Sequence, residues 1–135
     1  MKLPTAFLIN HGAHGYGKFI YDEQTLLAFH SKMNQIEDKL DRKLAYNYMY
    51  DMIKSGKIAG ARVLSIIQNN IENETAEDVL QDNFKWAIPA IIGKYIPMEQ
   101  YVNMNKGLFE STLKILASGN IKAASTQELL LDSVI

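Results

Sequence analysis

The clearest chemical pattern lies near the N-terminus, where Gly12, Gly17 and Lys18 match the spacing G-x-x-x-x-G-K of a phosphate-binding loop. In such a loop the next residue is Ser or Thr, whose hydroxyl binds magnesium, and a helix follows directly so that its amide groups face the anion. Here Phe19 takes the hydroxyl position, and residues 18–21 are aromatic and β-branched types that favour a strand. We therefore reject a nucleotide site and predict a glycine-rich hairpin turn.

Histidine and carboxylate side chains are the candidate metal ligands, because the chain has no cysteine. His11 and His14 lie three residues apart on the glycine loop, but a zinc site needs at least a third protein ligand. His30 falls on an apolar helical face, where a core or border histidine is the simpler interpretation. Neither H-E-x-x-H nor G-x-S-x-G occurs. We expect no catalytic residue, no metal ligand and no cofactor in this chain.

The composition indicates one globular domain of ordinary size. Of the 135 residues 47% are hydrophobic and 21% are charged, and the formal net charge is −1. A near-neutral chain lacks the basic surplus that a nucleic-acid partner requires. No apolar stretch approaches the roughly 20 residues of a membrane helix, so we expect no membrane partner. The absence of cysteine and of a signal-like N-terminus favours a cytoplasmic location.

The hydrophobic period changes after residue 21. Residues 5–10 and 18–21 read as two strands around the glycine loop, whereas the helical period prevails from Asp22 onward. We expect a mainly α fold: a short N-terminal β-hairpin remnant over residues 1–21, followed by an antiparallel, solenoid-like helical domain over residues 22–135.

The expected helices have recognisable ends. Gly56 and Gly119 are natural C-terminal stops, Pro97 suits a first helical position, and Pro89 should break or kink the helix that contains it. A Thr75–Asp78 capping pair should open the fourth helix. Six helices are expected. The first begins after Asp22, the second spans about residues 37–55, the third begins after Gly60 and the fourth after Thr75. The fifth runs from Pro97 to Gly119, and the last covers residues 126–135.

Two side-chain patterns carry finer expectations. The cluster Asp41, Arg42 and Lys43 is interpreted as a solvated helix face. The inward stripe of the helix after Pro97 is assigned to a set of apolar residues: Val102, Leu108, Phe109, Leu113 and Leu116.

The order of these pieces resembles that of aminopeptidase N-like zinc enzymes, the endoplasmic reticulum aminopeptidases included. Asn10, then Gly15-Tyr16, a short strand and Asp22 are similar to the stretch that closes the family's β-sandwich domain. The family's C-terminal helical domain then begins. The likeness covers about residues 5–117, and each motif alone is weakly specific.

The second part of the resemblance lies in the helices. In the family an arginine heads a leucine-rich helix that ends in glycine, and Arg42 and Gly56 match these positions. The family's next helix runs to a glutamate near its end, for which Glu74 is the best match. Six residues after the arginine the family often has an aspartate or asparagine, and Tyr48 departs from that pattern. Arg42 and Glu74 are therefore candidate structural or peptide-facing residues.

The resemblance implies a non-catalytic piece of a zinc aminopeptidase, because the family's zinc ligands and general base lie in an earlier domain. The chain would be inactive, with zinc in the parent enzyme, and would wall the cavity that receives peptide substrates. Its partners would be the parent's catalytic and β-sandwich domains, or a second copy paired through the N-terminal strands. The alternative is a free-standing helical protein-interaction module.

Overall fold

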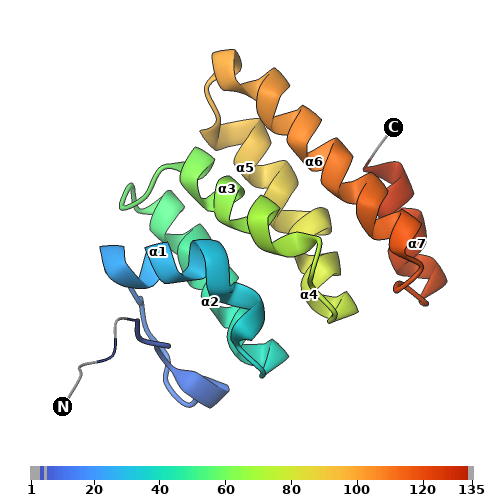
Figure 1. The fold of residues 1–135 in the computed structure, drawn as a ribbon. Coiled ribbons are helices and arrows are strands. Elements are labelled where there is room, and N and C mark those ends of the chain that lie inside the picture. The colour runs from blue at the N-terminus through green and yellow to red at the C-terminus, as the bar shows by residue number, and fades with distance from the viewer. Residues whose placement is uncertain (1–3, 5, 134–135) are drawn as a thin grey trace.

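The computed structural model describes residue 4 and residues 6–133, and these residues form a mainly helical array (Figure 1). The helical part of the expected fold class is therefore confirmed. No helix of this described part is long and apolar enough to cross a membrane. The α-helices are α1 (Glu23–Lys32), α2 (Lys39–Lys54), α3 (Gly60–Ile71), α4 (Glu77–Asp82), α5 (Ile88–Tyr95), α6 (Met98–Ser118) and α7 (Ala124–Asp132).

The expected N-terminal β-hairpin is wrong for residues 6–21, and residue 5 lies outside the described residues. This segment contains a 3-10 turn, η1 (His11–Ala13), and is otherwise irregular. Its polar and aromatic groups bond to helices instead of to a second strand. The Phe7 amide donates to the Thr25 hydroxyl at 3.1 Å, and the Tyr21 ring lies edge-on to Phe29 with centroids 4.8 Å apart. The β-prone aromatic residues thus serve helix packing.

The ends of the first two long helices follow the sequence signals. Asp22 caps α1 by accepting a hydrogen bond from the Thr25 amide at 2.8 Å, and Asp38 caps α2 through the Leu40 amide at 2.8 Å. Gly56 follows α2 with φ of 69°, a left-handed conformation that glycine adopts without penalty.

Helix α3 lies at the centre of the array and contacts α1, α2, α5 and α6. Its inward apolar residues are almost fully buried. Removing each such side chain from water contributes about 1.5–3 kcal/mol before entropy is counted. They are Val63, Leu64, Ile66, Ile67 and Ile71.

The helix around Pro89 changes its hydrogen bonding one turn before the proline. Regular α4 ends at Asp82, a π-helical turn η3 (Asn83–Ala87) follows, and α5 begins at Ile88. The Ile88 amide bonds to the Asn83 carbonyl, so the chain accommodates Pro89 through a wider turn and continues as a helix. The expected Thr75 cap is absent: α4 starts after Ala76, whose amide donates to the Glu74 carboxylate at 2.8 Å.

Helix α6 turns a different face inward from the expected one. Leu108 is buried and Leu116 is partly buried against the core, as predicted, but Val102, Phe109 and Leu113 are 72%, 45% and 46% exposed. Their places in the interior are taken by other α6 residues: Ser111, Thr112 and Ile115. Two of these are polar, and Thr112 returns its hydroxyl to the Leu108 carbonyl at 2.8 Å. Hydrophobicity alone therefore selected the wrong stripe.

Candidate functional site

The two residues singled out by the resemblance meet in the structure. Arg42 lies in the first turn of α2 and Glu74 in the loop between α3 and α4. The guanidinium Nε donates to Glu74 Oε2 at 2.9 Å, and Nη2 donates to Oε1 at 2.8 Å. The side chains are 7% and 2% exposed, so this is a two-pronged ion pair inside the protein.

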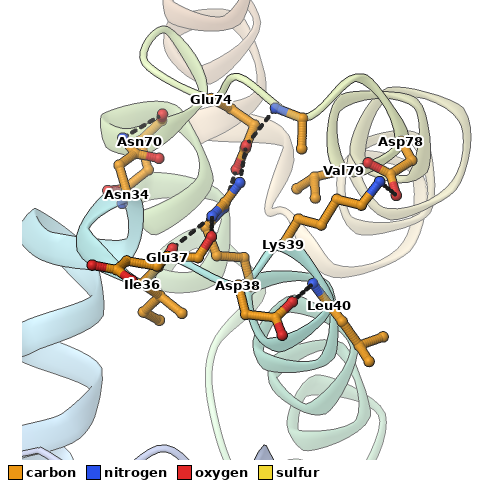
Figure 2. Close-up of polar contacts among 12 residues, drawn as sticks. Asn34, Ile36, Glu37, Asp38, Lys39, Leu40, Asn70, Glu74, Asp78 and Val79 are labelled. Atoms are coloured by element: carbon orange, nitrogen blue, oxygen red, sulfur yellow. Dashed lines mark hydrogen bonds and ion pairs between the residues drawn. The ribbon is translucent and has the colours of Figure 1, made fainter. Parts of the chain in front are cut away.

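The pair also ties together two loops, as Figure 2 shows around Glu74. Arg42 Nη1 donates to the carbonyl oxygens of Ile36 at 2.5 Å and Glu37 at 3.1 Å, in the loop before α2. The Glu74 carboxylate accepts the Ala76 amide, which opens α4. Arg42 thus joins α2 to the preceding loop, and Glu74 joins the end of α3 to the start of α4.

The hydrogen bonds of this cluster stabilise the fold and are not arranged to bind a ligand. Four of the guanidinium's N–H groups donate to neighbouring oxygens, leaving little capacity for a ligand. A buried ion pair is stable only when its donors and acceptors are satisfied in this way. Burial raises the pKa of the neighbouring Tyr46 phenol, and the Glu74 charge raises it further.

A polar groove of about 550 Å³ opens beside the ion pair. Lys39 on its wall pairs with Asp78 at 3.4 Å, as Figure 2 shows. Glu77 caps the start of α7, accepting from the Lys122 amide at 3.0 Å. Much of the charge that lines the groove is therefore already paired with other groups of the same chain. The remaining lining comes from four residues: Glu37, Arg42, Thr75 and Ala76.

The glycine loop holds an internal carboxylate in place of a phosphate. The Gly12 amide donates to Asp41 Oδ1 at 3.0 Å, and His11 Nδ1 contacts the other oxygen of the same carboxylate. Asp41 is 2% exposed and comes from the first turn of α2. Neither a strand nor a helix follows Lys18 directly, since α1 begins at Glu23. The geometry has little in common with a phosphate loop.

The same segment is fixed on α2 by a second contact. Asn10 donates from Nδ2 to the Tyr48 hydroxyl at 2.7 Å, and the Phe19 ring lies 4.8 Å from the Tyr48 ring. The Tyr48 hydroxyl thus supplies a polar contact to the N-terminal segment. Buried Tyr21 completes this aromatic cluster, and its burial raises the pKa of its phenol.

The histidines do not gather into a metal site. Within the described residues, no group of three His, Asp or Glu side chains is placed to hold an ion. His11 pairs with Asp41, whereas the half-buried His30 lies beside Ser65 at 3.2 Å and beside Asn69. This fits the border position expected for His30.

Sequence reasoning misjudged the charged cluster of α2. Asp41 and Arg42 were assigned to solvent but are 2% and 6% exposed, and only Lys43 behaves as expected, pairing with Asp82 at 2.8 Å. Periodicity could not find the partners, because His11 and Glu74 lie 30 and 32 residues away. The family pattern was the one signal that pointed to Arg42 and Glu74.

Comparisons with known proteins leave the chain without an assigned family. No family model, curated protein or solved structure matches it.

Proposed function

We propose that this chain is a non-catalytic helical domain of a zinc aminopeptidase, where it walls the cavity that receives peptide substrates. The proposal rests on the resemblance to aminopeptidase N-like enzymes. Zinc and the reacting groups would belong to the parent's catalytic domain. The chain would contribute shape, keeping folded proteins away from the metal.

The observation that best supports this proposal is the contact between Arg42 and Glu74. The family pattern selected these two residues independently of any structure, and they prove to form a buried, two-pronged ion pair. The resemblance named these two residues, 32 positions apart, and their contact inside the protein supports the proposal. The pair also suits the role, because it ties α2 to the loop between α3 and α4, as a rigid wall requires.

The N-terminal segment would join this wall to the parent's β-sandwich and catalytic domains. Residues 6–22 lie along α1 and α2 and carry the motif that resembles the family's interdomain stretch. In this structure they form no strand that could pair with a second copy. Contact with the parent's other domains is therefore the more natural role for the segment.

The proposal is tested first by the size of the polypeptide that carries this sequence in its source cells. An antibody against the 15.3 kDa chain should detect a much larger protein, and immunoprecipitates should hydrolyse aminoacyl-nitroanilides in a chelator-sensitive manner. The matching transcript should encode H-E-x-x-H upstream of these residues. A 15.3 kDa protein without associated peptidase activity would contradict the proposal.

A free-standing interaction module is the second candidate. It is favoured by a groove of about 570 Å³ between α5 and α6, with apolar residues such as Ile88, Ile92 and Phe109 on its walls. Such grooves receive amphipathic segments of partners. Detection of the 15.3 kDa chain alone, in a stable complex with another protein, would favour this reading.

A further inference from the structure

A groove of about 420 Å³ lies on the surface between α2 and the helical run from α4 through η3 into α5. The Lys43–Asp82 ion pair, at 2.8 Å, bridges one end, and the edge-on contact of Tyr50 with Tyr95 lies toward the other. The lining comes from both sides: Asn47, Tyr50, Asp82, Trp86, Ala87 and Ala90. This groove shares none of its described lining residues with the groove between α5 and α6.

Aromatic rings line the groove from both sides. Trp86, the single tryptophan of the chain, is 66% exposed in the π-helical turn η3, and turns of this kind are frequent at functional sites. Tyr50 supplies a second ring from α2, and the small side chains of Ala87 and Ala90 leave space beside the rings. Because tryptophan and tyrosine contribute most of the energy at many interfaces, the rings mark the groove as a candidate binding site.

The charges of the lining cancel. Asp82 is the one charged residue among the described lining residues, and its ion pair with Lys43 neutralises it. An acidic segment would meet the Asp82 carboxylate, and a basic segment would find that carboxylate already paired. The lining therefore favours an uncharged ligand.

Lysine side chains beside the groove strengthen this selection. Lys85 lies over the Trp86 ring, 5.5 Å from its centroid, and Lys54 lies 5.2 Å from the centroid of the Tyr50 ring. Lys54 also pairs with Asp51 at 2.6 Å. Neither lysine belongs to the lining, but each places a positive charge beside one of the rings. A cationic ligand would be repelled there, so the rings offer contact area to an apolar side chain.

The polar groups of the lining select an extended ligand. The Trp86 indole N–H donates, whereas the Asn47 amide and the Tyr50 hydroxyl both donate and accept. None of these groups is hydrogen-bonded within the described part of the chain. An extended segment has free amide and carbonyl groups to pair with them, whereas a helix has already bonded its own. From Asp82 to Ala90 the helix rises about 12 Å, the length of three to four extended residues.

We propose that this groove binds an extended, uncharged segment of another polypeptide, with an apolar side chain against Trp86 and Tyr50. The backbone of that segment bonds to the Asn47 amide and to the polar groups of the two rings. This binding belongs to the chain itself and goes beyond the proposed function, because it requires no catalytic domain.

The fluorescence of Trp86 reports binding directly, because the chain has no other tryptophan. The probe is the pentapeptide acetyl-Gly-Leu-Ser-Phe-Gly-amide, which is uncharged and too short to form a stable helix in water. It should shift the Trp86 emission to shorter wavelength with a dissociation constant of roughly 10–1,000 micromolar, as a small contact allows. No saturable change up to about 5 mM would overturn the proposal. Equally tight binding of peptides with lysine or aspartate in place of leucine and phenylalanine would contradict the choice of an uncharged segment.

Two variants of the full chain locate the site. Tyr50→Ala removes one ring, and Ala90→Gln fills the groove from a partly exposed helical position; each should raise the dissociation constant about tenfold or more. Far-UV circular dichroism checks that both variants remain folded, and the second keeps the test decisive if the first unfolds. The matched control, Phe109→Ala, alters the separate groove between α5 and α6 and should leave binding unchanged. Binding that is lost in Phe109→Ala and kept in the other two variants would overturn the assignment.

Discussion

The sharpest prediction about stability concerns the buried ion pair between Arg42 and Glu74. Arg42→Ala removes the donors of four hydrogen bonds and leaves the Glu74 carboxylate, 2% exposed, without its counter-charge. Breaking a buried pair on one side costs about 3–5 kcal/mol, a large part of the 5–15 kcal/mol that holds a small domain folded. Glu74→Ala should cost less, because Arg42 keeps the carbonyl groups of Ile36 and Glu37 as partners.

A double-mutant cycle separates the pair from the individual side chains. Urea unfolding followed by far-UV circular dichroism would give the free energy of unfolding for the wild type, the single variants Arg42→Met and Glu74→Leu, and the double variant that combines them. The double variant should be more stable than the sum of the single losses predicts, by about 2 kcal/mol or more, since no charge is left buried alone.

The chain offers a matched control for this experiment. Arg62 and Glu23 form a second two-pronged pair, but their side chains are 36% and 64% exposed. Arg62→Ala should therefore change stability far less than Arg42→Ala, because water screens and replaces the lost contact. Equal costs for the two alanine variants, or additive losses at Arg42 and Glu74, would refute the reasoning from burial.

Two further measurements follow from the contacts of α7 and α5. The hydrogen bond from the Lys122 amide lowers the pKa of Glu77, so its stabilisation of the α7 start is complete above the usual value of 4.5 and is lost as the pH falls through the lowered pKa. The stability difference between wild type and Glu77→Gln should therefore shrink on acidification, and a difference that persists in strong acid would contradict this assignment. Gly60→Ala should destabilise by about 1–3 kcal/mol, because the new Cβ would lie 2.7 Å from Tyr95 Cβ. Gly93→Ala, which meets nothing within 4 Å in a helix, should stabilise by about 0.5–1 kcal/mol, and urea unfolding compares the two.

The helices could be predicted from the sequence because their signals are local. Asp22, Gly56 and Gly119 act on the nearest turn of the backbone, and the structure places helix ends beside each of them. The N-terminal strands could not be judged in this way. Residues 18–21 have the composition of a strand, but a strand needs a partner, and the aromatic rings find a better one in Tyr48 and Phe29.

The inward face of α6 shows a different limit of sequence reasoning. Both of its stripes satisfy the helical period, and the more hydrophobic one, with Val102 and Phe109, was assigned to the core. The structure instead buries Ser111 and Thr112, since Ser111 reaches Glu72 at 2.8 Å and Thr112 bonds to its own helix. Such satisfied polar residues can be buried at little cost. The more hydrophobic residues Val102, Phe109 and Leu113 are then left on the exposed side of the helix.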